Sequence, residues 1–181
     1  ARQLQKIEDH DFITQPGIFG WDKIDKGSKL LLSHIPDNVS GYGADFGAGY
    51  GYLSNHIGAR CPKVRGLIVA EADYNALKCA KENLKRYDII DYQWVDLTKP
   101  LKLNRLLDFI VMNPPFHAGK KADSDIGLKF IENAAQSLRK DGALYLVANA
   151  HLPYEKHIQH LFSKIEKLDE NQGFKVYKAC K

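Results

Sequence analysis

The fold of this chain is decided by residues 44–51, which read Ala-Asp-Phe-Gly-Ala-Gly-Tyr-Gly. The apolar start of this stretch predicts the end of a buried strand, and the glycines predict a turn into a short helix over residues 52–60. Open α/β sheets bind their ligands where a strand meets the following helix, and glycines there let the backbone approach a ligand closely. Residues 44–51 therefore predict both an α/β fold and a ligand site.

The alternation of strands and helices continues along the chain. Strands are predicted over four apolar or β-branched runs, at residues 64–70, 92–95, 108–112 and 143–148. Helices are predicted where apolar residues recur at helical spacing, over residues 75–86, 126–138 and 155–162. This order is typical of parallel strands joined by helical crossovers.

The end of the chain predicts an antiparallel hairpin. Its two short segments, residues 164–168 and 174–179, are separated by the turn-rich residues 169–173. Because no linker, repeat or low-complexity tract divides the 181 residues, we expect a single domain. It comprises an N-terminal extension and helix over residues 1–40 and a Rossmann-like core over residues 41–181.

Composition bounds the class of protein. With 44% apolar and 27% charged residues, the chain should bury an ordinary globular core. Its apolar runs fall far short of the ~18 residues that span a membrane, so we expect no membrane partner. The net charge of +4 is compatible with a nucleic-acid partner but does not demonstrate one.

The cysteines and histidines argue against disulfide and metal chemistry. The three cysteines form no Cys-x-x-Cys pair, which fits a reducing cytoplasm and neither a disulfide framework nor a zinc knuckle. His157 and His160 share a predicted helix, but no third ligand of suitable spacing accompanies them, so we expect no metal. The N-terminus does not resemble a secretory signal, and its lack of Met hints at a processed or truncated chain.

The glycine loop indicates the type of cofactor. A dinucleotide fingerprint requires Gly-x-Gly-x-x-Gly, whereas Gly51 comes one residue early after Gly47 and Gly49. This spacing disfavours a nicotinamide or flavin cofactor. Asp45, just ahead of the glycines, would repel a pyrophosphate but suits a cationic ligand such as S-adenosylmethionine.

Two further acids follow the next predicted strands. Glu71 comes 26 residues after Asp45, near the spacing at which an acidic side chain accepts hydrogen bonds from ribose hydroxyls. Asp96 follows the third strand and could accept from an adenine amine, or it could cap a turn. Since the carboxyl ends of parallel strands share one edge of the sheet, the three acids should line one crevice.

Residues 113–117 read Asn-Pro-Pro-Phe-His and follow a buried strand. The prolines fix the backbone and supply no amide donors, which leaves rigid carbonyls beside the Asn113 side-chain oxygen. Such an acceptor pair can hold a planar amine by both hydrogens, and Phe116 can stack on the group that bears it. This arrangement suits methylation of an amino group, because drawing the hydrogens out of plane localises the nitrogen lone pair.

These residues resemble the class I S-adenosylmethionine-dependent methyltransferases that modify amino groups. The closer resemblance, over nearly the whole chain, is to the catalytic C-terminal half of the ribosomal RNA guanine-N2 methyltransferases, within the methyltransferase small family. It rests on residues 45–51 and 113–117 and on the stretches 16–19, 23–32, 147–154 and 173–177. It implies a mostly parallel seven-stranded sheet and methyl transfer to N2 of a guanosine in ribosomal RNA or a ribosomal subunit.

The resemblance also implies residue roles. The methionine part of the cofactor would be held by Asp45, Gly47, Gly49 and Gly51, its ribose by Glu71 and its adenine by Asp96, with Phe19, the Lys26-Gly27-Ser28 turn and Asn113 also beside it. Asn113 and the Pro114 carbonyl would hold the guanine amine, and Phe116 would stack on the base. Lys120 and Lys121 are placed to meet phosphates or to form a solvated loop, and His117 could contact substrate.

Some features depart from the family pattern. Its enzymes usually carry a degenerate first half that helps to bind RNA, so this sequence is either a fragment missing an N-terminal RNA-binding domain or a stand-alone version. Glu71 occupies a position where Asp is more usual. Two alternatives stay open: methylation of a protein glutamine amide, which Phe116 in place of a more usual Tyr disfavours, and a catalytically silent module that binds S-adenosylmethionine.

Overall fold

The computed structural model of the protein describes residues 2–7, 10–116 and 121–181, apart from the side chains of residues 5–7, 10 and 121–124. Within these ranges, seven strands form one sheet in the order β5-β4-β3-β6-β7-β9-β8. The parallel strands are β3 (Gly41–Phe46), β4 (Val64–Glu71), β5 (Ile90–Trp94), β6 (Leu107–Met112) and β7 (Leu138–Asn149). The antiparallel strands are β8 (Lys164–Asn171) and β9 (Phe174–Cys180). The predicted fold class is confirmed.

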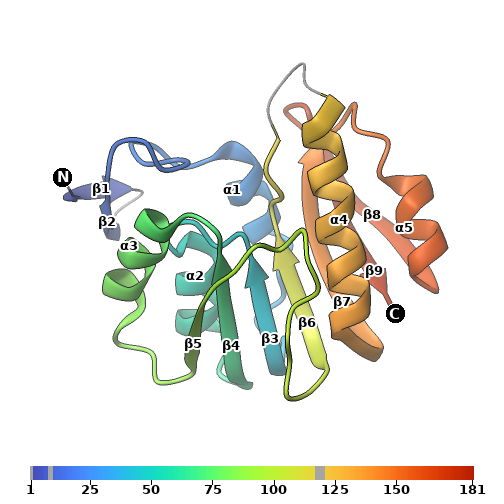
Figure 1. Ribbon diagram of the computed structural model, residues 1–181, viewed down its shortest axis with the longest axis horizontal. Helices are drawn as coiled ribbons and strands as arrows, with labels where there is room; N and C mark the ends of the chain where they lie inside the picture. Colours follow the sequence, from blue (N-terminus) through green and yellow to red (C-terminus); the bar gives the residue numbers. More distant parts are fainter. Residues whose placement is uncertain (1, 8–9, 117–120) are drawn as a thin grey trace.

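Helices cover both faces of the sheet (Figure 1). One face packs against α1 (Lys26–Leu32), α2 (Tyr52–Arg60) and α3 (Tyr74–Leu84), and the other against α4 (Lys121–Ser137) and α5 (Glu155–Leu161). Successive strand residues serve opposite faces, since Val111 packs with the α1–α3 side and Met112 with the α4 side. This double burial explains the unbroken apolar run over residues 109–112 of β6. In the described ranges, no helix is long and apolar enough to cross a membrane.

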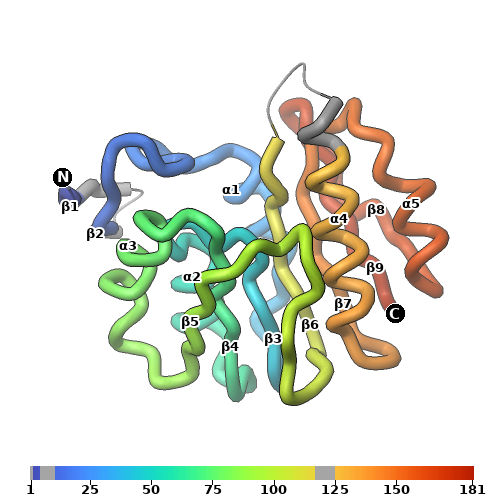
Figure 2. Tube along the Cα trace, in the orientation of Figure 1, coloured from blue at the N-terminus to red at the C-terminus, as the bar shows by residue number. Residues whose placement is uncertain are grey.

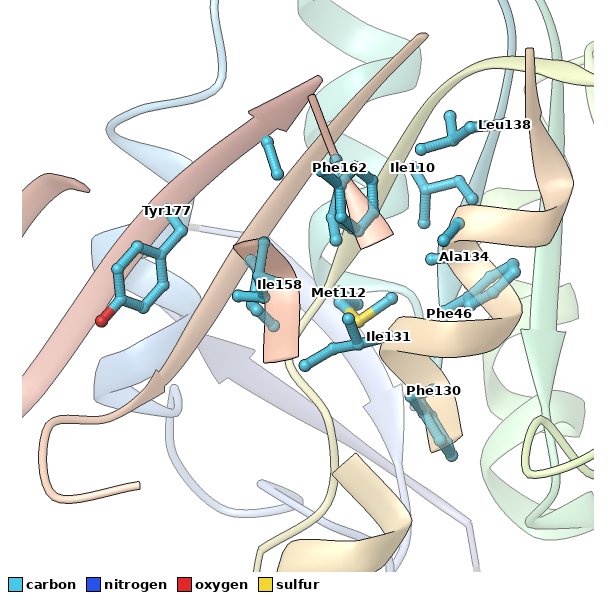
Figure 3. Close-up of a cluster of buried hydrophobic side chains, with 14 of the residues drawn as sticks. Phe46, Ile110, Met112, Phe130, Ile131, Ala134, Leu138, Ile158, Phe162 and Tyr177 are labelled. Atoms are coloured by element: carbon cyan, nitrogen blue, oxygen red, sulfur yellow. The ribbon is translucent and has the colours of Figure 1, made fainter. Parts of the chain in front are cut away.

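The core beneath α4 supports the strand ends that lead to the site. Figure 3 shows Phe130 and Ile131 of α4 in the same buried cluster as Phe46 at the end of β3 and Met112 at the end of β6. Phe46 and Met112 are both 0% exposed. Close packing at these two positions holds the residues that follow each strand.

Gly43 lies under an aromatic ring of the core. A Cβ atom at this position would lie 2.2 Å from Cζ of Phe109, which is itself buried. We expect Gly43→Ala to lower the free energy of unfolding by about 3 kcal/mol, because the ring has no free space to enter. Denaturant unfolding measures the change, and a loss below about 1 kcal/mol would contradict this packing argument.

An N-terminal hairpin was not anticipated within residues 1–40. Its strands, β1 (Gln3–Ile7) and β2 (His10–Thr14), form a separate antiparallel sheet. Figure 2 shows it beside α3. Asn83 of α3 joins the two, because its Oδ1 accepts from Ile13 N at 2.7 Å and its Nδ2 donates to the Ile13 carbonyl at 2.9 Å. The sequence alone gave no sign of this long-range contact.

The closing hairpin corrects the predicted turn. Residues 169–173 were expected to separate the two strands, but β8 continues through Asn171 and the turn is limited to Gln172 and Gly173, with φ of 51° and 82°. Asp169 and Glu170 pair with Val176 and Lys175 of β9. The cross-strand hydrogen bonds therefore override the turn preference of these polar residues.

Candidate active site

The site lies where the order of the sheet reverses. From β3 the chain passes to β4 on one side, whereas β6 pairs with β3 on the other side. Phe46 and Met112 are partners in the parallel register of β3 and β6. Gly47 and Asn113, the next residues, therefore leave the same edge side by side, at the position where open α/β sheets bind ligands.

Two adjoining cavities open at this edge. The smaller is about 50 Å³ and the larger about 300 Å³. Asp45 lines the smaller cavity, whereas Glu71, Pro114 and Phe116 line the larger. Both cavities are lined by Phe19, Asp25, Gly47, Gly49 and Asn113. The structure thus brings together most of the residues that the sequence predicted.

Asp45 carries a buried carboxylate. Its side chain accepts a hydrogen bond from Ser54 Oγ at Oδ2, over 2.6 Å, and the residue is only 1% exposed. Oδ1 is also buried, and no described group donates to it. Burial raises the pKa of Asp45 from 3.8 to about 7, although the Ser54 hydrogen bond opposes the rise. The free oxygen is an acceptor suited to a charged donor within the smaller cavity.

Glu71 links the glycine loop to the turn before α3. Its Oε2 accepts from Gly49 N and its Oε1 from Asp73 N, each at 2.8 Å. Burial is the main cause that raises the pKa of Glu71. Each carboxylate oxygen can accept a second hydrogen bond, so Glu71 can still bind ligand hydroxyls. Asp73 has a structural role, because its Oδ1 caps α3 by accepting from Asn75 N and Ala76 N.

The three glycines of the loop are not equivalent. Gly47, Gly49 and Gly51 all have positive φ, of 75°, 58° and 96°. A Cβ at Gly49 would meet no atom within 4 Å, whereas one at Gly51 would lie 3.0 Å from Leu84 Cδ1. Gly51 precedes α2 as its N-cap and lines neither cavity. Close packing against α3 therefore explains why residue 51 is a glycine. At residue 49, a glycine leaves open space beside the cavity.

Asp96 lies beyond the lining of both cavities. Its Oδ1 accepts from Thr98 N at 3.0 Å and from Thr98 Oγ1 at 2.7 Å. These bonds hold the pKa of Asp96 below its usual value. The next residue, Leu97, lines the larger cavity, and Asn133 of α4 fixes it by donating to its carbonyl at 3.0 Å. A contact between Asp96 and adenine stays a prediction.

The Asn113 side chain has a defined orientation. Its Nδ2 donates to Asp25 Oδ2 at 2.8 Å and to Ser28 Oγ at 2.9 Å. Sequence reasoning did not single out Asp25, although an Asp just before a helix is a recognisable N-cap signal. Phe116 meets the ring of His151 edge-on, with 5.4 Å between centroids. Phe19 is 65% exposed and forms part of the cavity rim.

Several other residues of the site were not singled out from the sequence, because apolar and aromatic side chains are typical of a buried core. Leu97, Phe130, Tyr154 and Phe174 line the larger cavity with apolar surface. Tyr154 and Phe174 lie in two of the stretches that carry the family resemblance, but no role was assigned to either. Phe130 has only the periodicity of a predicted helix. The cavity consequently combines an apolar lining with a few polar groups, which is typical of small-molecule sites.

Some predicted contacts fall elsewhere. His117 and Lys120 lie outside the described residues, as does the side chain of Lys121. Lys26 is exposed and Gly27 packs against Phe174, so of that turn only Ser28 lines a cavity. His157 Nε2 lies 3.0 Å from Glu132 Oε1. Across the described ranges, no group of three or more His, Cys, Asp or Glu residues could hold a metal ion.

Comparison with known proteins identifies the family. Residues 9–178 match the family described as the methyltransferase small domain. The chain belongs to this family. It is 32% identical over 175 residues to ribosomal RNA small subunit methyltransferase C of Idiomarina loihiensis, covering 95% of this chain and 50% of that protein. It is 34% identical to the Shewanella sediminis protein of the same name, over 89% of this chain and 46% of that protein.

A solved structure of a methyltransferase agrees with this assignment. The Thermus thermophilus 16S rRNA N2 G1207 methyltransferase, in complex with AdoMet and guanosine, superposes with a TM-score of 0.81 at 25% identity. The match covers 100% of this chain and 50% of that one. The chain thus spans about half the length of the methyltransferases that it matches.

Proposed function

We propose that this chain transfers a methyl group from S-adenosylmethionine to the exocyclic N2 of a guanosine in ribosomal RNA. The observation that carries the proposal is the position of Asn113, which lines both cavities. On one side lies the buried carboxylate of Asp45, and on the other lie Pro114 and Phe116. A methyl donor and an amine acceptor would meet at Asn113. The names of the relatives, and the AdoMet and guanosine bound to the Thermus enzyme, support this reading.

The residues present fit the cofactor. The unpaired Oδ1 of Asp45 is an acceptor for the α-ammonium group, and the open space at Gly49 leaves room for the methionine part. Glu71 lines the larger cavity, where it would accept from ribose hydroxyls. When bound, S-adenosylmethionine supplies an electrophilic methyl group on a sulfonium.

The acceptor side activates the amine. Asn113 Oδ1 and the Pro114 carbonyl would accept its two hydrogens, which turns the nitrogen lone pair out of conjugation with the base. The two prolines keep these acceptors rigid, and Phe116 would stack on the guanine. Holding the nitrogen in line with the methyl donor is then the main catalytic task of the protein.

The proposed partner is ribosomal RNA or a ribosomal subunit. A guanosine within a paired region must leave its helix to reach this cavity, at a cost of a few kcal/mol that stacking on Phe116 would partly offset. Because the chain matches only about half the length of its relatives, we propose that an N-terminal RNA-binding domain cooperates with it. A cytoplasmic location follows from this substrate.

A labelling experiment tests the reaction. The protein is incubated with methyl-labelled S-adenosylmethionine and, separately, with small subunits, large subunits, naked ribosomal RNA and a ribosome-free protein fraction. We expect label in RNA, recovered as N2-methylguanosine after digestion to nucleosides. Label recovered from protein as methylated glutamine would overturn the proposal, and no label despite normal cofactor binding would favour a silent binding module.

Two glycine variants test the division of roles in the loop. We expect Gly49→Ala to weaken cofactor affinity about tenfold, because its Cβ enters the open cavity, and to cost about 1 kcal/mol of stability, because a φ of 58° strains an alanine. Gly51→Ala should instead destabilise the fold by about 2 kcal/mol through the contact with Leu84. Calorimetric titration and thermal unfolding measure the two effects. An equal loss of affinity in both variants would contradict the distinction.

A further inference from the structure

A hydrogen-bond network joins the start of α1 to the Asn113 side chain. Asn113 Nδ2 donates to Asp25 Oδ2 and to Ser28 Oγ, so both of its hydrogens are engaged. An ionised carboxylate only accepts hydrogen bonds, so Asp25 requires the nitrogen of the amide on its side. The planar amide then directs Oδ1 away from α1. Among the described residues, none donates a hydrogen bond to Oδ1.

We propose that Asp25 and Ser28 are positioning residues for methyl transfer, which hold the Asn113 amide with its oxygen toward the acceptor amine. This inference rests on the proposed function. An inverted amide would present its own hydrogens to the hydrogens of the substrate, and two donors repel each other. Without Asp25 and Ser28, the side chain would populate both orientations and only one would accept from the amine.

The network is rigid because Asp25 is held from the other side as well. The same Oδ2 atom accepts from Ser28 N at 2.7 Å and thereby caps α1. Gly27 is buried between the Asp25 carboxylate and the Phe174 ring, where a Cβ would lie 3.1 Å from Oδ2 and 3.0 Å from Cε1. The first turn of α1 therefore has little freedom to move, and the acceptors for Asn113 stay in place.

Four variants separate positioning from helix capping. Ser28→Ala removes one acceptor for Asn113 but keeps the backbone N that Asp25 caps. Asp25→Ser keeps a capping oxygen, but its side chain is too short to reach Asn113. The combined variant removes both acceptors. Asp25→Asn is the conservative control, because its amide oxygen can take the place of Oδ2 and accept both hydrogen bonds.

The kinetic readout is the rate of methyl transfer to RNA at saturating substrates. We expect the combined variant to lose at least tenfold in kcat, with the dissociation constant for S-adenosylmethionine changed less than threefold. The Asp25→Asn variant should keep a kcat within threefold of that of the starting protein. In an Asn113→Ala background the same two changes should cause no further loss, because residues acting through Asn113 are not additive with it. A loss of cofactor affinity in place of kcat would overturn the proposal.

A second readout does not depend on activity. In nuclear magnetic resonance spectra of the protein, the side-chain NH₂ protons of Asn113 should exchange slowly with solvent, and the combined variant should lose this protection. Unchanged exchange in that variant would overturn the positioning role. An inactive starting protein that nonetheless shows protected Asn113 protons would contradict only the proposed function, so the two failures are distinguishable.

Discussion

Asn113→Ala is expected to reduce the rate of methyl transfer by about 100-fold or more, while the affinity for S-adenosylmethionine changes little. Removing one preorganised polar group that acts on the reacting atoms typically costs about 10²–10³ in rate. Asn113 would act on the nitrogen of the acceptor, which is a poor nucleophile until its hydrogens are drawn out of the plane of the base. The cofactor contacts that we propose for Asp45 and Glu71 would stay intact in this variant.

Single-turnover rates and calorimetric titration with the cofactor measure the two quantities separately. Asn38→Ala is a matched control, because Asn38 is exposed and lines neither cavity. It should leave both quantities unchanged. If Asn113→Ala retained more than half of the rate, the acceptor role of Asn113 would be wrong.

Asp45→Asn is expected to weaken cofactor binding by at least 100-fold and yet to stabilise the free protein at neutral and alkaline pH. Asp45 is 1% exposed and its Oδ1 lacks a donor, so the ionised form is poorly solvated. The rise of its pKa from 3.8 to about 7 corresponds to at most about 4 kcal/mol of lost stability once the carboxyl ionises. The cofactor ammonium would offset this penalty, which couples ligand binding to the buried charge.

The sign of the pH effect follows from the raised pKa. Below the unfolded value of 3.8 the carboxyl is protonated in both states and costs nothing. Stability of the free protein is then lost as pH rises to about 7 and stays lost above it. The melting temperature of Asp45→Asn should therefore exceed that of the starting protein at pH 8 and match it near pH 4. Equal melting temperatures at pH 8 would contradict a buried, ionised Asp45.

Cofactor affinity gives the complementary test. Below about pH 7, cofactor binding to an ionised Asp45 requires that the carboxyl first lose its proton. The dissociation constant of the cofactor should therefore rise about tenfold for each pH unit below that value. Burial also raises the pKa of Glu71, and the Asp45→Asn variant retains Glu71 as an internal control. Titrations between pH 5.5 and 7.5 should show the steeper dependence in the starting protein. Parallel profiles would assign the pH dependence to Glu71.

Much of the fold was predictable because parallel strands impose a simple pattern. Ile110, Val111 and Met112 are buried on both faces of the sheet, so the end of their strand appears as an unbroken apolar run. Because parallel strands all end at the same edge of the sheet, the residues that follow them come together at that edge. Asp45, Glu71 and Asn113 could therefore be assigned to one site from their places at or just after the carboxyl ends of strands.

Contacts between distant segments were not predictable. The N-terminal hairpin depends on Asn83, which is 70 residues from Ile13. Gly51 belongs to the same glycine pattern as Gly47 and Gly49, but the packing of α3 places Leu84, and not a cavity, where its Cβ would lie. Asp96 occupies the expected place after β5, yet its local bonds to Thr98 decide where its carboxylate points. Local sequence specifies neither the contact of Asn83 with Ile13 nor the approach of Leu84 to Gly51, whereas the Asp96 bonds form the local turn cap that was its alternative role.

The sequence by itself determined the architecture and the residue types at the cavity, because periodicity, glycine turns and proline rigidity act within a few residues of the chain. Only the tertiary structure decided which atoms of those residues face the cavity. Asp25 and Asn113 are 88 residues apart, and their hydrogen bond exists because α1, which packs on β7 and β9, begins beside the residue that follows β6. An amide has two chemically opposite ends, and the partner behind it sets which end a substrate meets.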